Sequence, residues 1–264
     1  MKYLTIDIEQ SDDGIAKITL NRADKLNSLS LKMMREITRA CDEFELSGKA
    51  RVIVINGAGR AFCAGADIED LSEVAAQKPV QMEANLKAWF KFLWRIKSIE
   101  LPTIAAVHGE ALGGGFALAA ACDMRIASDD ARAGAVFVKL GASSADMGVS
   151  WLLPRIVGAG WAAELMFTGD IIDAAKGEII GFFNHVVPRD QLMKAAMELA
   201  AKLAAGPPLG LKFTKRALNR SIWDGLQGQL EYESATQTLT FLSEDFQEGL
   251  KSFFEKRKAV FRGR

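Results

Sequence analysis

The sequence predicts an α/β protein with two regions, a core over residues 1–206 and a helical C-terminal region over residues 207–264. In the core, a buried strand runs into a glycine turn and then a helix twice, once around Ala64 to Asp67 and again around Gly113 to Gly115. This recurrence indicates stacked turns of similar strand and helix units. Pro207 and Pro208 mark the boundary, because the pattern after them is helical to the end of the chain.

The composition is that of an ordinary globular protein. Hydrophobic residues make up 49% and charged residues 25% of the 264 positions, which excludes disordered and fibrous classes. The 33 basic residues balance 33 acidic ones, so we expect no nucleic-acid partner. The sequence shows no signal-peptide pattern and no apolar window of about 18 residues, so we expect no membrane partner and a cytoplasmic location. Cys41, Cys63 and Cys122 have neither a disulfide nor a zinc spacing, and we expect reduced thiols and no metal.

The elements of the first half follow from the spacing of apolar side chains. Residues 3–9 and 15–20 predict a hairpin, because apolar residues alternate and a turn-forming Ser-Asp-Asp-Gly lies between them. Residues 30–46 predict a helix that Ser30 caps, with one apolar stripe. The Val-Ile-Val-Ile of residues 52–55 lacks alternation, which is typical of a strand covered on both faces.

The second half begins with a predicted helix over residues 80–98, which ends before Pro102. Residues 103–107 predict a second buried strand that leads directly into the glycine turn. Beyond Gly148 the pattern is mostly helical. It includes a helix over residues 191–204 with Leu192, Ala196, Leu199 and Leu203 on one face.

The glycine turns predict a site for a negatively charged oxygen. Glycine lets a ligand approach the backbone closely, and the first N–H groups of a helix have no partner inside it. The amide of Gly114 and that of Ala66, from the first glycine loop, could therefore form an oxyanion hole. Tight packing of helix on sheet would explain the glycines equally well. The glycine patterns of a phosphate loop or a dinucleotide site are not met.

Four ordered motifs resemble the crotonase superfamily, the enoyl-CoA hydratase and isomerase group. They are NRADKLNSL from residue 21, AFCAGADI from residue 61, GEALGGGFALAAACD from residue 109 and LTFLSEDFQEGLKSFFEKRKAVF from residue 239. The resemblance covers essentially the whole chain. It implies a crotonase-type spiral of β-β-α turns, followed by a helical C-terminal region that forms trimers, often paired into hexamers.

The resemblance also implies an acyl-CoA thioester substrate, with no cofactor other than the coenzyme A that the substrate carries. By position, the amides of Ala66 and Gly114 would bind the thioester carbonyl as it becomes an enolate. The resemblance further implies CoA contacts near the adenine, along the pantetheine path, and at the nucleotide end of a CoA bound to the next subunit. Lys25 and Leu26 would lie near the adenine, Asp67, Ile68 and Glu69 would line the pantetheine path, and Phe253 and Lys256 would lie near that nucleotide end. Ala64 is a further expected contact with the CoA substrate.

The sequence departs from the well-studied hydratases of the group, which use two glutamates. The corresponding places hold Ala117 and Phe137, neither of which can transfer a proton. Asp146 lies where related dienoyl-CoA isomerases and naphthoate synthases carry an aspartate. Asp146 could instead cap the helix that follows it. In the superfamily context we expect it to be the acid or base, because an apolar pocket raises the pKa of a carboxyl group.

Other polar residues are weaker candidates. We expect His108 to bond a backbone carbonyl, His185 to pack in a strand, and Cys63 to be a small buried thiol. Glu110 could point into the pocket or to solvent. Ser143 and Ser144 could bond the substrate, although no serine, histidine and aspartate arrangement is recognisable.

Three functions are open at this point. The leading hypothesis is an enzyme of the hydratase/isomerase type in which Asp146 shuttles a proton, by double-bond isomerisation or an atypical hydration. A second is a thioester or C–C bond hydrolase or decarboxylase of the same superfamily, some members of which lack both glutamates. A third is a CoA-binding homologue without catalytic activity, or an RNA-binding scaffold, which the zero net charge disfavours.

Overall fold

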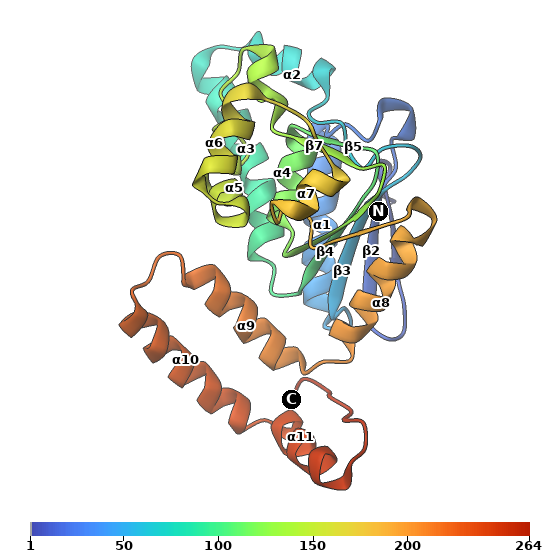
Figure 1. The fold of residues 1–264 in the computed structure, drawn as a ribbon, viewed down its shortest axis with the longest axis vertical. Helices are drawn as coiled ribbons and strands as arrows, with labels where there is room; N and C mark the ends of the chain where they lie inside the picture. Colours follow the sequence, from blue (N-terminus) through green and yellow to red (C-terminus); the bar gives the residue numbers. More distant parts are fainter. Residues whose placement is uncertain (1) are drawn as a thin grey trace.

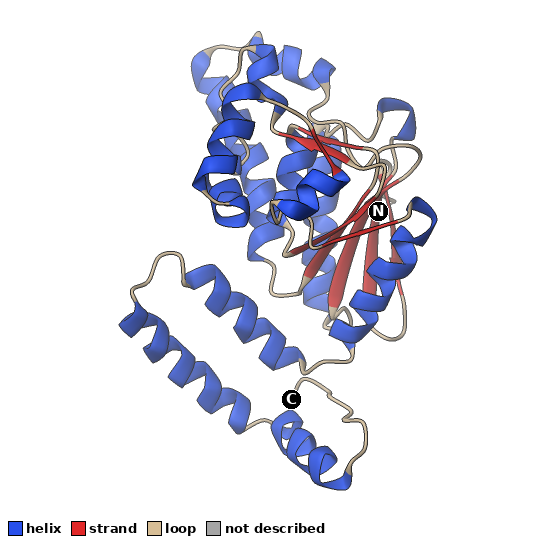
Figure 2. Ribbon diagram, in the orientation of Figure 1, coloured by secondary structure: helices blue, strands red, loops and turns tan. Residues whose placement is uncertain are grey.

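The computed structural model describes residues 2–264 and has two parts, a layered α/β body and an arm of helices that extends from one end of it (Figure 1). Figure 2 shows the strands gathered within the body, with helices on both sides, and the arm built from helix and loop. The C-terminus lies beside the junction of body and arm.

A six-stranded sheet forms the centre of the body, in the order β1-β2-β3-β4-β6-β9. The pair β1 and β2 is antiparallel, as the predicted hairpin requires, and each later pair in this sheet is parallel. The strands are β1 (Ile6–Gln10), β2 (Ile15–Leu20), β3 (Val52–Gly57), β4 (Thr103–Val107), β6 (Met124–Ser128) and β9 (His185–Val187).

A second, three-stranded sheet has the order β5-β7-β8, with β5 at Glu110–Leu112, β7 at Arg132–Gly134 and β8 at Ile172–Asp173. Two single bridges, Leu29 to Ala66 and Cys63 to Ala111, link earlier parts of the chain in the same parallel sense. Successive turns of the chain thus pass through the large sheet, the smaller ladder and a helix. This spiral confirms the predicted stacking of strand, glycine turn and helix.

Helices cover both faces of the large sheet because the buried side chains of its inner strands point both ways. Ile53 and Ile55 pack in the main core with α1, α3 and α4, whereas Val52 and Val54 pack against α8. The helices of the body are α1 (Leu31–Ser47), α2 (Ile68–Ala75), α3 (Pro79–Ser98), α4 (Gly114–Ala121), α5 (Val149–Val157), α6 (Ala159–Thr168), α7 (Ala174–Ile179) and α8 (Leu192–Ala204), with short 3₁₀ helices η1 (Ala23–Lys25), η2 (Val136–Leu140) and η3 (Arg189–Gln191).

Two predicted helices show how local chemistry sets their ends and faces. Ser30 caps α1, since its side-chain oxygen accepts a hydrogen bond from Met33 N. In α8 the four expected residues share the face that packs on the sheet, although Leu199 and Leu203 are only partly buried. The buried residues are Leu192, Ala196, Ala200 and Ala204, at a spacing of four. We attribute the difference to the small alanine side chains, which let α8 lie close to the sheet.

The arm consists of α9 (Pro208–Arg220), α10 (Leu226–Phe241) and α11 (Glu244–Glu255). Lys215 joins α9 to the body, because its ammonium group lies 2.7 Å from Asp123 Oδ2 and donates to Leu101 O. The three helices enclose an open groove of about 1190 Å³ that is lined mainly by apolar side chains.

The prediction of helix to the end of the chain was wrong for residues 256–264. Lys256 ends α11 in the left-handed conformation, with φ 52°. The Asp245 carboxylate then accepts hydrogen bonds from Arg262 N and Gly263 N, which hold the last residues against the first turn of α11. Within residues 2–264, no helix has the length and apolar character needed to cross a membrane.

Candidate active site

The turn that opens α4 uses its three glycines for different reasons. Gly113 has a φ of 50°, which favours glycine. A Cβ on Gly115 would lie 2.0 Å from Cys63 O, so no side chain fits against the preceding turn of the spiral. A Cβ on Gly114 would instead meet Leu29 Cδ1 and Met147 Sδ at 3.2 Å and Ala66 N at 3.5 Å. The position of this missing Cβ, which we call the space at Gly114, is therefore bordered by two side chains and the Ala66 nitrogen rather than by backbone carbonyl groups.

Two backbone N–H groups border this space, those of Ala66 and Gly114. Within residues 2–264, neither donates a hydrogen bond to the protein. Gly114 is the first residue of α4, so it lacks an acceptor within the helix. At Ala66, the bridge to Leu29 uses Gly65 O and Asp67 N, which leaves the Ala66 N–H unused. Two unused donors beside one space can bind a single oxygen.

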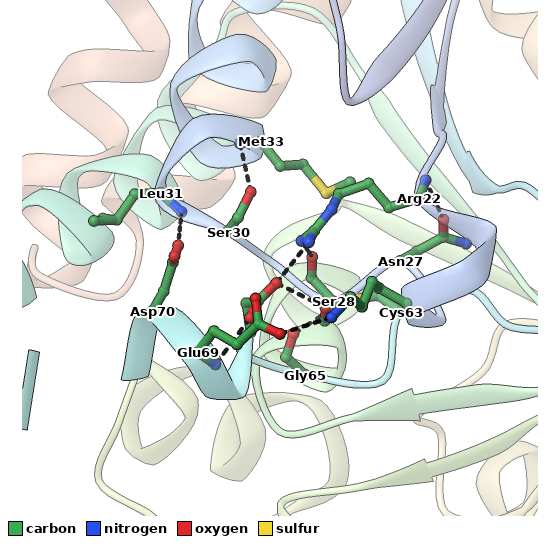
Figure 3. A network of polar contacts seen from close by, with 12 residues as sticks. Arg22, Asn27, Ser28, Ser30, Leu31, Met33, Cys63, Gly65, Glu69 and Asp70 are labelled. Carbon is green, nitrogen blue, oxygen red and sulfur yellow. Dashed lines mark hydrogen bonds and ion pairs between the residues drawn. The ribbon is translucent and has the colours of Figure 1, made fainter. Parts of the chain in front are cut away.

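A polar network of Arg22, Asn27, Asp67 and Asp70, which we call the clamp, holds the loop that carries Ala66 (Figure 3). Arg22 lies at its centre, with Nη2 2.7 Å from Asp67 Oδ2 and Nη1 donating to Ser28 O. Asn27 is fully buried at a φ of 56°, and its amide nitrogen donates to both Ala58 O and Ala61 O at 2.8 Å. These bonds join the loop after β2 to the loop after β3.

Carboxylates at the start of α2 complete the clamp. Asp67 caps α2 by accepting from Glu69 N, and Asp70 accepts from Leu31 N at 2.6 Å. Burial alone would raise the pKa of Asp67, but the hydrogen bonds from Arg22 and Glu69 N lower it. Asp67 is therefore a buried anion with a paired cation. It fixes the residue directly after Ala66.

Asp146 lies in the loop between η2 and α5, beside Met147, whose sulfur borders the space at Gly114. Burial raises the pKa of Asp146, even though its carboxylate accepts a hydrogen bond from Met147 N at 2.7 Å. The alternative that Asp146 caps the next helix was wrong. Gly148 is the N-cap of α5, and no side chain caps that helix.

Apolar side chains occupy the two places discussed for glutamates. Ala117 is buried one turn into α4, where its N–H donates to Gly113 O. Phe137 Cε1 lies 3.8 Å from the Cβ position of Gly113. Both residues are thus next to the glycine turn. Neither can carry a proton.

The remaining polar candidates are engaged elsewhere or exposed. His108 is buried, with Nε2 3.2 Å from Gly59 O, as expected. Burial and the nearby Arg189 lower the pKa of His108 to about 4. The Ser144 hydroxyl donates to Met166 O at 2.8 Å, and burial raises the pKa of Cys63 to about 12. His185 lies in β9 but is exposed, so its predicted packing role was wrong.

Glu110 and Ser143 lie near the same region without a defined role. Glu110 starts β5 and is half-buried, and its carbonyl accepts from Cys63 N. Ser143 is exposed, and its hydroxyl accepts from Ala145 N.

The CoA-binding residues expected from the resemblance fall into two groups. Leu26 and Ala64 are joined by the hydrogen bond from Ala64 N to Leu26 O, and Lys25 pairs with Glu69 at 2.8 Å. Asp67 belongs to the clamp itself, and the exposed Ile68 follows it as the first residue of α2. Phe253 lies on α11 and Lys256 directly follows this helix, in the arm (Figure 1). Among residues 2–264, no three histidine, cysteine, aspartate or glutamate side chains are grouped as metal ligands.

Sequence reasoning missed the clamp residues Arg22 and Asn27. Asn27 carried one usable signal, since asparagine is second only to glycine in how readily it adopts a positive φ in a turn. Arg22 carried none, because an arginine in a polar loop is ordinarily exposed.

Comparison with known proteins places the whole chain in one group. Residues 10–264 match the sequence pattern described as enoyl-CoA hydratase/isomerase. The short-chain-enoyl-CoA hydratase of Clostridium acetobutylicum is 35% identical over 252 residues, which are 95% of each chain.

Solved structures agree. Enoyl-CoA hydratase subunit I from Geobacillus kaustophilus superposes with a TM-score of 0.92 at 39% identity, covering 100% of both chains. The enoyl-CoA hydratase from Bacillus anthracis gives a TM-score of 0.93 at 33% identity, covering 99% of this chain and 100% of that one. The spiral of strand, glycine turn and helix and these matches together show that the chain belongs to the enoyl-CoA hydratase/isomerase family of the crotonase superfamily.

Proposed function

We propose that this enzyme binds an acyl-CoA thioester with its carbonyl oxygen between the N–H groups of Ala66 and Gly114, and stabilises the enolate that forms there. The observation that carries this proposal is the pair of unused donors beside one space. Such donors are aimed at a charge that develops only in the transition state, so they accelerate enolate formation rather than merely tighten binding.

Asp146 is the proposed proton carrier. Its raised pKa makes it a stronger base than an exposed aspartate, and its neighbour Met147 borders the oxyanion space. One carboxylate can remove a proton at Cα or Cγ and return it at the other position. A single group is therefore suited to moving a double bond, or to an atypical hydration, in which it would act on water and carbon in turn.

The proposal needs no cofactor or metal besides the coenzyme A of the substrate. Ser144 as a nucleophile is disfavoured, because its hydroxyl donates to a backbone carbonyl. The three thiols are buried and free, which agrees with a reducing compartment such as the cytoplasm.

We further propose assembly into trimers, or hexamers of two trimers, through the apolar groove of α9 to α11. Large exposed apolar side chains on the arm support this, among them Leu218, Leu230, Phe253 and Phe254. In that assembly Phe253 and Lys256 would approach a CoA held by the next subunit. Sedimentation velocity should give the mass of a trimer or hexamer, and a monomer would contradict the proposal.

Assays with crotonyl-CoA, a 3-enoyl-CoA and a dienoyl-CoA test the function. We expect turnover of at least one thioester, and a 10²- to 10⁴-fold lower kcat in Asp146→Asn, the range typical of a lost acid or base. Asp12→Asn, a change of an exposed carboxylate in the hairpin turn, is the control and should keep full activity. Unchanged kcat in Asp146→Asn would remove Asp146 from the mechanism. Release of free CoA or carbon dioxide would identify cleavage instead, and CoA binding without any turnover would indicate a non-catalytic homologue.

A further inference from the structure

Arg125 on β6 is a buried cation that forms no salt bridge within residues 2–264. Its side chain is 5% exposed, and Asp123, whose charge acts on it, is paired with Lys215 instead. The guanidinium instead donates to carbonyl oxygens, Phe182 O at 2.5 Å, Cys122 O at 2.8 Å and Ala119 O at 3.4 Å. Burial lowers the pKa of Arg125, but an arginine retains its proton in proteins. A full positive charge therefore lies in the core.

This charge is joined to both ends of α4. At the C-terminal end, the guanidinium bonds Ala119 O and Cys122 O, in the last turn of the helix and just beyond it. Its Cζ also lies 5.6 Å from the ring centre of Phe182. Phe182 in turn stacks on Phe116, with ring centres 4.4 Å apart and planes 7° apart. Phe116 belongs to the first turn of α4, two residues after Gly114.

The charge and the helix act in the same direction at Gly114. The dipole of a helix makes its N-terminus positive, and a cation at the C-terminus stabilises that orientation. The eight residues of α4 span about 12 Å, and each is buried, so solvent screens the field little. At an effective dielectric constant of about 20, a unit charge about 12 Å away changes the energy of an oxyanion enough for roughly a tenfold effect on rate.

We propose that Arg125 is a positioning residue for the oxyanion site, one that holds α4 at both ends and adds positive potential at the Gly114 N–H. This inference rests on the proposed function, since it requires a thioester oxygen at Gly114. It concerns no new contact with substrate. The charge acts through the helix.

The probe is butyryl-CoA labelled with ¹³C at the carbonyl, which has no double bond to hydrate or shift. Isotope-edited infrared spectroscopy measures how far the bound carbonyl stretch moves to lower frequency, which reports the field of the oxyanion site. We expect the wild-type enzyme to lower the frequency. Arg125→Gln keeps a hydrogen-bond donor but loses the charge, and it should lose a clear part of that shift. Arg125→Lys keeps the charge and should retain most of it.

Kinetics give a second measurement, with whichever thioester the enzyme turns over. Arg125→Gln should lower kcat about tenfold and leave KM within about twofold, because the effect grows with charge on the oxygen. Lys17→Gln, which removes a half-buried cation of β2, three strands away from β6 in the large sheet, is the control and should leave the carbonyl band unmoved.

The outcomes separate the two proposals. If butyryl-CoA binds to the wild type with an unshifted carbonyl, the proposed function fails. If the wild type shifts the carbonyl and folded Arg125→Gln shifts it equally, the inference about Arg125 fails. If Arg125→Gln does not fold, Arg125→Lys decides, because a folded lysine variant without the shift would overturn the role of the charge.

Discussion

Gly114→Ala separates the chemistry of the glycine turn from its packing. The added methyl would lie 3.2 Å from two side-chain atoms, Leu29 Cδ1 and Met147 Sδ, and 3.5 Å from Ala66 N. Both side chains are flexible at these atoms, and Gly114 has an ordinary φ, so we expect the fold to persist. Alanine is also the better helix former by up to about 1 kcal/mol. The unfolding midpoint in urea should therefore change little.

The same methyl would occupy the space beside the two N–H groups, where the oxyanion is proposed to lie. Blocking access to one donor is expected to lower kcat by about 10²- to 10³-fold, or about 2.7–4 kcal/mol of transition-state stabilisation. The assay is kcat on the best thioester substrate, together with urea unfolding of the same preparation. A folded Gly114→Ala enzyme with wild-type kcat would refute the two-donor site.

Two further glycines provide the controls. Gly115→Ala would place a methyl 2.0 Å from Cys63 O, so it should lose both stability and activity. Gly160→Ala, in α6, meets nothing within 4 Å and should change neither beyond a small gain in stability. Only Gly114→Ala should separate activity from folding.

Three more predictions concern the groups around the site. The pKa of His108 is near 4 when folded and near 6.5 when unfolded, so the unfolded chain binds more protons between these values. Stability should fall as the pH drops from 6.5 to 4, by about 3 kcal/mol from this group, and urea unfolding of His108→Gln should show a weaker pH dependence. Arg22→Met leaves the Asp67 carboxylate buried without its cation, and we expect a loss of about 3 kcal/mol of stability and reduced kcat, measured by urea unfolding and thioester turnover. Burial raises the pKa of the thiols of Cys41, Cys63 and Cys122 to about 12 each. Iodoacetamide at pH 8 should therefore label no cysteine in the native enzyme and all three after unfolding. A wild-type pH profile in His108→Gln, full stability in Arg22→Met or rapid native labelling would contradict the respective argument.

Much of the fold was predictable because its signals are local. The hairpin, the Ser30 cap and the strands at 52–55 and 103–107 follow from side-chain spacing within a few residues. The three-residue strand β5 was missed, because its partner residues in β7 lie 22 positions further on, as in the pair Glu110 and Arg132. The last residues were missed for a similar reason, since Asp245 holds Arg262 from a distance in sequence.

The candidate site was likewise predictable only in part. The paired amides were expected from glycine placement alone, whereas the clamp was not, because it depends on which loop lies opposite Arg22. Arg125 shows the limit most clearly. Its sequence neighbours gave no sign that it would lie under α4, since its contacts with Phe182 cross 57 residues.

The spiral distributes the parts of the site over consecutive windings of the chain. One winding supplies Ala66, the next supplies Gly114, and the one after that supplies the loop with Asp146. A change in the third winding could thus exchange the proposed proton carrier while the two amides below it remain in place. Redesign of the reaction should accordingly begin in residues 136–147 and leave the two inner windings untouched.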